Sequence, residues 1–395
     1  MRTLNQQNFK NQRVIIRVDF NVPLNEALEV TDRTRIEAAK PTIDYILEQG
    51  GSCVLLSHLG RPKGNDPKLS LSHIVETVAD VLGRPVKFCS TTVGDAAEAA
   101  AKNLEQGTVL LMENLRFHKE ETAGDILFSE KLARLGTFYV NDAFGTAHRA
   151  HASTTIIANL FKDNKCFGIL LEKEVIAIEK VMEKGEKPIL AILGGAKVSS
   201  KITIIESLLE KVDHLIIGGG MVYTFTKALG GQVGNSICEP DYCDYALELL
   251  EKAKTKGVEI HLPVDVLAGD DFSNDATQKT FDVMNIPDGW EAMDAGPESQ
   301  VLFHNLILKC KTILWNGPMG VFEFSNFSKG TIAAGDSIAE APQAGAFSLV
   351  GGGDSVAAVK QFGFENKMSY ISTGGGAMLE SLEGKILPGI AALNE

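Results

Sequence analysis

The sequence of 395 residues predicts an α/β protein with two doubly wound parallel sheets. Short runs rich in Val, Ile and Leu recur along the chain without alternating with polar residues, which is typical of strands buried on both faces of a parallel sheet. Segments of helix length separate these runs. Since domains average roughly 150 residues, the length indicates two or three domains. The number of runs is enough for two sheets, which we favour over a single very wide sheet.

The predicted strands form two groups. The first group lies at 13–18, 52–57, 108–112 and 137–141, and the second at 188–193, 213–217, 259–262, 311–315, 346–350 and 369–372. Between the groups, Leu171, Val175, Ile178 and Met182 follow helical spacing. We therefore expect a linking helix at 171–187, between a first domain at 1–170 and a second domain at 188–377.

Composition narrows the class of protein. The net charge of −13 argues against general binding to nucleic acid or to a membrane surface. No apolar run approaches the roughly 18 residues that a membrane helix needs. The polar N-terminal segment and six cysteines without a CxxC pair are typical of a protein in a reducing compartment, so a cytoplasmic location is expected.

Charged side chains follow the strands of the first half. All ten arginines lie at or before Arg149, and a guanidinium fork suits phosphate and carboxylate oxygens. Since ligands of open α/β sheets bind beyond the carboxyl ends of strands, these side chains should converge there: Asp19, Asn21, His58, Arg61, Arg116, His148 and Arg149, with Arg35 joining from a loop or helix start. A single arginine of this kind could be a surface ion pair. Together they favour a site for a small phosphorylated carboxylate, with Asp19 and Asn21 at a hydroxyl.

Glycine clusters follow the strands of the second half, at 194–195, 218–220, 351–353 and 374–376. Glycine lets backbone amides approach an anion closely, and helix N-termini attract negative charge. Four such strand ends point to a nucleotide phosphate chain. The chain has no GxxxxGK[ST] motif, no protein-kinase catalytic loop and no GxGxxG.

Two polar features of this half have alternative interpretations. Lys197 and Lys201 are four residues apart and would share one helix face, which is either a phosphate contact or a solvated surface. Asp354 follows a glycine cluster, where it either caps a helix or ligates Mg²⁺ beside the phosphates.

The motifs that carry these features resemble those of the phosphoglycerate kinases over nearly the whole chain. They occur in the family's order: RVDFNVPL (17–24), SHLGRPKG (57–64), ENLRFHKEE (113–121), NDAFGTAHRAHAS (141–153), LGGAKVSSK (193–201), IIGGGM (216–221), LPVD (262–265), WNGPMGVFE (315–323), GGGDS (351–355) and STGGGA (372–377).

The resemblance implies two Rossmann-like domains joined by a helix, with a C-terminal tail, 378–395, that packs on the first domain. It implies a monomer that closes like a hinge and moves a phosphoryl group between ATP and the carboxylate of 3-phosphoglycerate, giving 1,3-bisphosphoglycerate and ADP, with Mg²⁺.

By residue, the resemblance implies that 3-phosphoglycerate binds Asp19, Asn21, Arg35, His58, Leu59, Gly60, Arg61, Arg116 and Arg149. It places the nucleotide on Gly195, Lys197, Lys201, Gly219, Asn316, Pro318, Val321, Glu323, Gly352, Gly353, Asp354 and Ser355, with Asp354 at the metal and Glu323 at the ribose. The expected catalytic residues are Arg35, Lys197, Lys201, Gly352 and Gly375. Among them, Arg35 and Lys201 should hold the transferred group.

The sequence departs from the family pattern at two places. Glu291-Ala292 stands where the family often has Met-Gly, close to the implied adenine pocket, and Ser355 stands where threonine is common. Two alternatives stay open at this point. One is a kinase for another small carboxylate, and the other is a non-catalytic nucleotide-binding or scaffold protein.

Overall fold

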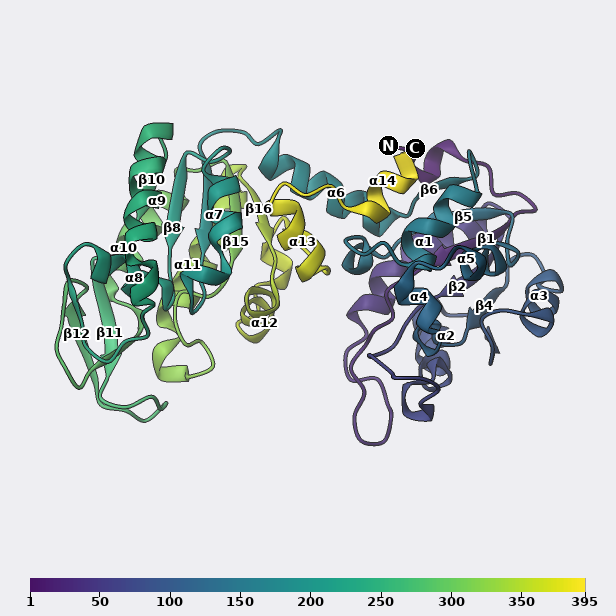
Figure 1. Cartoon of the computed structure of the whole chain (residues 1–395), viewed down its shortest axis with the longest axis horizontal. Helices are drawn as coiled ribbons and strands as arrows, with labels where there is room; N and C mark the ends of the chain where they lie inside the picture. Colours follow the sequence, from purple (N-terminus) through teal and green to yellow (C-terminus); the bar gives the residue numbers. More distant parts are fainter. Residues whose placement is uncertain (395) are drawn as a thin grey trace. The chain divides into compact units, whose positions relative to one another are not determined.

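A computed structural model describes residues 1–394. Residue contacts divide the chain into two compact units. The first unit comprises Met1–Val175 together with the C-terminal residues from Ile386, and the second comprises Ile176–Lys385. Each unit contains one six-stranded parallel sheet flanked by helices (Figure 1).

The sheet of the first unit has the strand order β3-β4-β2-β1-β5-β6. Its strands are β1 (Arg13–Arg17), β2 (Ser52–Leu56), β3 (Val86–Cys89), β4 (Val109–Met112), β5 (Phe138–Asn141) and β6 (Lys165–Phe167). Its helices are α1 (Thr34–Glu48), α2 (Val75–Leu82), α3 (Asp95–Lys102), α4 (Lys119–Ala123), α5 (Ile126–Ala133) and α14 (Pro388–Asn394). From β1 the chain adds β2, β3 and β4 on one side and later β5 and β6 on the other, so the strand order switches between β1 and β5. In sheets of this kind a ligand crevice forms at the carboxyl ends of the strands at such a switch point.

The main sheet of the second unit has the order β10-β8-β7-β15-β16-β17. Its strands are β7 (Ile189–Leu193), β8 (His214–Ile217), β10 (Glu259–His261), β15 (Thr312–Asn316), β16 (Phe347–Val350) and β17 (Tyr370–Ile371). Its helices are α7 (Ile202–Leu208), α8 (Met221–Ala228), α9 (Cys243–Lys256), α10 (Pro297–Ile307), α11 (Lys329–Glu340), α12 (Gly353–Gln361) and α13 (Gly375–Leu382). The order in which the chain adds strands switches from one side to the other between β7 and β15.

The ten predicted strands all belong to these two sheets, which confirms the fold class. The structure adds elements that the apolar pattern did not indicate. The first unit gains strands β3 and β6. The second unit contains a small antiparallel sheet of β12 (Gln278–Asp282), β11 (Asp265–Gly269) and β14 (Glu291–Ala295), and a short pair of β13 (Asn285–Ile286) and β9 (Gln232–Val233). Strand β12 is largely exposed, so it lacks the apolar run that marks a buried strand.

The linking helix and the tail differ from the expected boundaries. Helix α6 runs Ile169–Met182 and ends before Gly185, where a side chain would meet the carbonyl oxygen of Lys180 at 2.7 Å. Helix α13 belongs to the second unit, because Met378 packs against Gly351. Only the residues from Ile386 onward join the first unit, where α14 lies beside β6 (Figure 1).

Each sheet is buried between its helices. All five residues of β2, β7 and β15 are buried. The first core contains Ile16, Leu55, Leu111 and Val140, and the second contains Ile192, Ile216, Ile313 and Trp315. Within residues 1–394, no helix combines the length and the apolar character that a bilayer crossing requires.

Candidate active site: an arginine-lined site and a glycine-lined pocket

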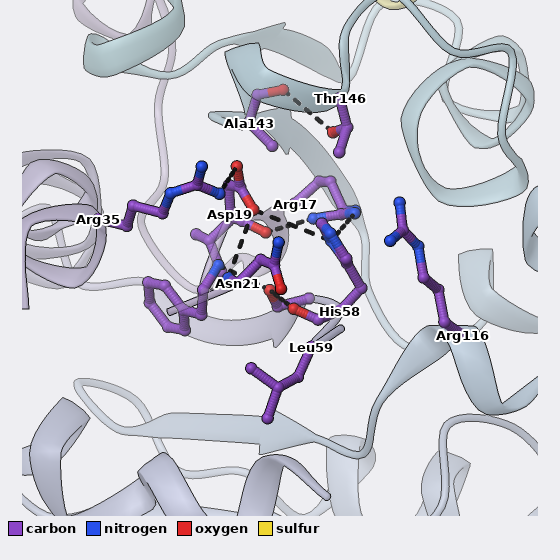
Figure 2. A network of polar contacts seen from close by, with 12 residues as sticks. Arg17, Asp19, Asn21, Arg35, His58, Leu59, Arg116, Ala143 and Thr146 are labelled. Atoms are coloured by element: carbon purple, nitrogen blue, oxygen red, sulfur yellow. Dashed lines mark hydrogen bonds and ion pairs between the residues drawn. The ribbon is translucent and has the colours of Figure 1, made fainter. Parts of the chain in front are cut away.

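Strand register brings the polar loops of the first unit together. Arg17, the last residue of β1, pairs with Leu56 of β2 on one side and with Asn141 of β5 on the other. The three strands therefore end at the same level, and the loops that follow them share one edge of the sheet. This alignment places Asp19 beside His58, with Ala143 and Thr146 close by (Figure 2).

Asp19 and Asn21 are held in place by neighbouring loops. The Nη1 of Arg35 donates to the Oδ2 of Asp19 at 2.6 Å. The Oδ1 of Asn21 accepts from the backbone N–H of Gly60 at 2.8 Å, which leaves the Nδ2 amide of Asn21 to donate. In Figure 2, Arg35 and Arg116 approach this group from opposite sides.

His58 is a neutral imidazole in this site. The Nη2 of Arg17 lies 3.1 Å from the Nδ1 of His58. Because a guanidinium only donates hydrogen bonds, Nδ1 must accept, and the ring proton lies on Nε2. Burial, together with Arg17, Arg116 and Arg35, lowers the pKa of His58 well below its usual range. The 3.9 Å approach of Nδ1 to Asp19 is therefore not an ion pair.

Arg17 is a member of the site that the sequence analysis assigned no role. It is almost completely buried, and its Nε donates to the Oγ of Ser153 at 2.8 Å. Ser153 donates in turn from Oγ and N to the buried carboxylate of Glu121. Burial raises the pKa of Glu121, an effect that Arg17 opposes. The sequence could have identified Arg17, because an arginine inside an apolar strand is a buried charge and such a charge needs a partner.

The remaining predicted residues lie around this core. Arg116 donates to the carbonyl oxygen of Gly60 at 2.8 Å, and Arg61 is near enough to lower the pKa of Arg116, although burial and Arg17 contribute more. Arg149 is exposed. The backbone groups of Leu59 both bond to the side chain of Asn114. The structure thus places Leu59 and Gly60 as loop supports whose own N–H groups are already bonded.

His151 is a second residue without a predicted role. Burial, followed by Arg116, Arg17 and Arg149, lowers its pKa to about 4, so the ring is neutral at pH 7. Its Nδ1 is buried and makes no hydrogen bond within residues 1–394. A buried polar atom without a partner, placed among arginines, is consistent with a ligand position.

Glycines permit close packing at the strand ends of the second unit. A side chain at Gly194 would meet the carbonyl oxygen of Pro318 at 1.9 Å, so the loops after β7 and β15 are in backbone contact. Gly219 has a φ of +65°, and a side chain there would meet the backbone of Gly195 at 2.7 Å. These contacts bring the loops after β7, β8 and β15 together near the switch in strand order between β7 and β15.

A pocket of about 490 Å³ opens beside these loops. Five of the predicted nucleotide residues line it together with Asp354: Gly195, Gly219, Pro318, Val321 and Glu323. The apolar part of its wall includes Tyr223, Phe272, Met293 and Phe324, which the sequence analysis did not assign. Glu291 and Ala292, the two departures from the family pattern, line the same pocket.

Lys201 points to the loop after β15, where its ammonium donates to the Oδ1 of Asn316. The amide of Asn316 donates to the carbonyl oxygen of Gly351 at 2.8 Å. Burial lowers the pKa of Lys201, and Asp354 opposes that shift. Lys197 is exposed and precedes a short 3₁₀ turn, so the two lysines do not share a helix face as the spacing had indicated.

The glycine-rich segment 351–355 begins α12. Gly352 is the N-cap, and its φ of +94° favours glycine. Gly353 and Asp354 lie in the first turn, so Asp354 is not the capping residue. The Oγ of Ser355 accepts from the N–H of Gly317 at 2.5 Å. Gly375, the first residue of α13, lies close to Gly352, since a side chain on it would be 3.7 Å from the Cα of Gly352.

Comparisons with known proteins point to one family. The profile of the phosphoglycerate kinase family matches residues 4–385. The chain is similar to the phosphoglycerate kinase of Porphyromonas gingivalis, with 52% identity over 416 residues and 99% of both chains covered. It is also similar to the cytosolic phosphoglycerate kinase of Nicotiana tabacum, with 50% identity over 393 residues, 100% of this chain and 98% of the other.

A solved structure resembles the whole chain. The phosphoglycerate kinase of Coxiella burnetii superposes with a TM-score of 0.91 at 40% identity, covering 99% of this chain and 98% of that one. The family match, the full-length relatives and the structural likeness lead to the same assignment. The chain belongs to the phosphoglycerate kinase family, whose members are phosphotransferases with a carboxyl group as acceptor.

Proposed function

We propose that the arginine-lined site of the first unit holds 3-phosphoglycerate. Arg61, Arg116 and Arg149 supply charge for a phosphate, and Arg35 supplies it for the carboxylate end. Asp19 accepts from the substrate hydroxyl and the amide of Asn21 donates to it. The observation that supports this most directly is the cluster of guanidinium groups around His58, whose pKa is lowered by burial and further by these positive charges.

The pocket of the second unit is the proposed ATP site. The glycine loops give the phosphates access to backbone amides, and Lys201 supplies a partly buried positive charge. Glu323 bonds to the ribose hydroxyls, and the apolar wall contacts the adenine. Lys197 is exposed, so it is free to reach the outer phosphates as the nucleotide binds.

The residues present fit a magnesium ion. Asp354 offers an exposed carboxylate at the pocket wall, beside a helix N-terminus that favours phosphate, and it is not used as a cap. A carboxylate oxygen completed by phosphate oxygens and water is the ligand set that Mg²⁺ prefers. When bound, the ion neutralises charge on the phosphate oxygens.

The acceptor carboxylate needs no general base. Its pKa lies far below 7, so it is already a nucleophile, and the protein's task is to position two anions and stabilise charge on the moving phosphoryl group. Arg35 and Lys201 are the proposed contacts to that group. Gly352 and Gly375, both at helix starts, supply backbone amides for the same charge.

Since each unit carries one proposed substrate site, we expect the two units to close over the bound substrates during the reaction. Closure also excludes water, which would otherwise hydrolyse the acyl phosphate. The expected result is a smaller radius of gyration by X-ray scattering with both ligands than with either alone. Identical scattering profiles in all states would contradict closure.

We further propose a cytoplasmic monomer. The cytosolic relative and the six free cysteines, four of them buried, support the location, and family resemblance alone supports the oligomeric state. Arg35, Lys201 and Asp354 are all present at the two sites. Their presence favours this proposal over the two alternatives, a kinase for another small carboxylate and a non-catalytic protein.

The deciding experiment is ATP turnover with 3-phosphoglycerate and Mg²⁺, measured for the chain and for Lys201→Met. A panel of small carboxylic acids without the phosphate serves as the specificity control. Rapid turnover that requires both 3-phosphoglycerate and Lys201 would support the proposal. Equal turnover with several acids, or none with any of them, would contradict it.

A further inference from the structure

A cluster of two histidines and a glutamate lies on the edge of the second sheet, outside the pocket. It consists of His214 on β8 and Glu259 and His261 on β10. The register of the two strands explains why these three side chains lie together. Glu259 pairs directly with His214 in the parallel ladder, and His261 lies two residues beyond Glu259, so all three side chains project from one face of the sheet.

The donor atoms of the cluster converge on a single point. The Nδ1 of His214 is 3.2 Å from the Nε2 of His261 and 3.3 Å from the Oε2 of Glu259, and the Nε2 of His261 is 3.7 Å from the same oxygen. Ligands bound tetrahedrally to zinc at its usual bond lengths are about 3.3 Å apart. The spacing of the three atoms therefore nearly matches three corners of a zinc coordination shell.

From this convergence we propose that His214, Glu259 and His261 form a binding site for a zinc-type divalent cation, with water as the fourth ligand. Two imidazoles and one carboxylate select zinc, cobalt or nickel over magnesium, so this site is chemically distinct from the one at Asp354. The neighbouring Asp213 is not a fourth ligand, because its carboxylate bonds to Lys187 and to the N–H of Ile189.

The position of the cluster indicates what the ion would do. His214 is the first residue of β8, whereas the glycines of the ATP pocket follow the last residue of that strand, so the cluster lies toward the opposite end of the sheet. Strand β10 is one of the two edge strands of this sheet. The ion would join β10 to β8 through side chains, stabilising the edge without touching the substrates.

Cobalt binding to the chelator-treated full chain tests the site. We expect one Co²⁺ per chain with the strong visible absorption of tetrahedral coordination, displaced by Zn²⁺. Glu259→Gln and His261→Gln should each weaken binding at least about tenfold, since loss of an outer-shell partner alone costs ten- to a hundredfold. His73→Gln, which removes an imidazole from the first unit, is the matched control and should bind as the parent does.

The possible outcomes distinguish this site from cobalt binding elsewhere in the chain. Unchanged affinity in both cluster variants would overturn the proposal, as would weak absorption typical of six-coordinate cobalt. A thiolate charge-transfer band in the near ultraviolet would assign the ion to Cys238 and Cys243 instead, and would also overturn it. Glu259 is exposed, so its glutamine variant should fold even if a histidine variant does not.

Thermal unfolding provides an independent readout. Zn²⁺ in excess over its dissociation constant should raise the melting temperature of the parent chain by several degrees, and should leave that of Glu259→Gln unchanged. Turnover of ATP with Mg²⁺ should be the same in both chains. An equal zinc-induced rise in the variant would overturn the proposal.

Discussion

The Nη1 of Arg35 lies 2.6 Å from the Oδ2 of Asp19. The Asp19 side chain is only 11% exposed and that of Arg35 is 35% exposed, so the pair sits at the mouth of the arginine-lined site. Arg35 enters from the start of α1, while Asp19 follows β1. An arginine in this position is oriented before any substrate arrives, which is what stabilisation of a transition-state charge requires.

Replacing Arg35 by alanine should lower kcat by about 10²–10³ with both substrates saturating, because a preorganised charge next to the transferred group is lost. Steady-state turnover measures the effect. Arg33→Ala is the matched control, since Arg33 is two residues away but only approaches Asp80, at 3.9 Å on the surface. A near-normal kcat in Arg35→Ala would remove Arg35 from the list of catalytic residues.

Deprotonation of Lys201 should lower the activity at a less alkaline pH than an ordinary lysine would. Burial lowers the pKa of its ammonium, so the positive charge is lost below the pH at which an ordinary lysine titrates. We expect kcat/KM for ATP to fall as the pH rises through that lowered pKa. Lys201→Arg should be slower at pH 7 but should lack this limb, because guanidinium stays charged. The same limb in both proteins would assign the titration to another group.

The methyl group of Ala292 should restrict the nucleotide pocket. Ala292 is buried on β14, lines the pocket, and donates its N–H to Ser236. Ala292→Gly removes the methyl, and we expect kcat/KM for GTP to rise several-fold relative to that for ATP. Ala295→Gly makes the same change on the same strand outside this pocket. Equal ratios in Ala292→Gly and the parent would show that the methyl does not contact the base.

Asp142 should make stability depend on pH. It follows β5 and is fully buried against the start of α6, and burial raises its pKa to about 7. Its Oδ1 accepts from the N–H groups of Leu170 and Leu171, while Oδ2 is buried and makes no hydrogen bond within residues 1–394. Burial favours the protonated carboxyl over the ionised one, and the hydrogen bonds from Thr42, Leu171 and Leu170 oppose this shift only in part.

The sign of the effect follows from proton linkage. The folded pKa of Asp142 lies above the unfolded value of about 3.9, so the native state holds the proton more tightly. Its contribution to stability is therefore largest below about pH 4, is lost as the pH rises to about 7, and is constant above that, with a limiting slope of about 1.4 kcal/mol per pH unit.

Asp142→Asn should lose this dependence. The free energy of unfolding of the variant minus that of the parent should increase between pH 5 and pH 7, as measured by denaturant titration. Asp163→Asn changes a carboxylate that is 89% exposed and should give no such increase. Asp294, whose pKa burial also raises to about 7, remains in both proteins, so only the difference is diagnostic. A difference that stays constant with pH would contradict the assignment.

The sequence by itself determined the class of fold and the chemistry of each half. Buried parallel strands show as unbroken apolar runs, so β1, β2, β7 and β15 were visible, and their following loops carried the arginines and glycines. Strand β12 escaped because an exposed antiparallel strand need not be apolar.

Only the tertiary structure decided which side chains meet. Strand register placed Arg17 against His58, and a short helical segment distant in sequence, Ala152–Ile156, supplied Ser153. The same is true of His214, Glu259 and His261, which are 45 or more positions apart across the two strands. Local sequence determines the pattern of burial along one element, whereas pairing between elements sets which donors and acceptors lie within bonding distance.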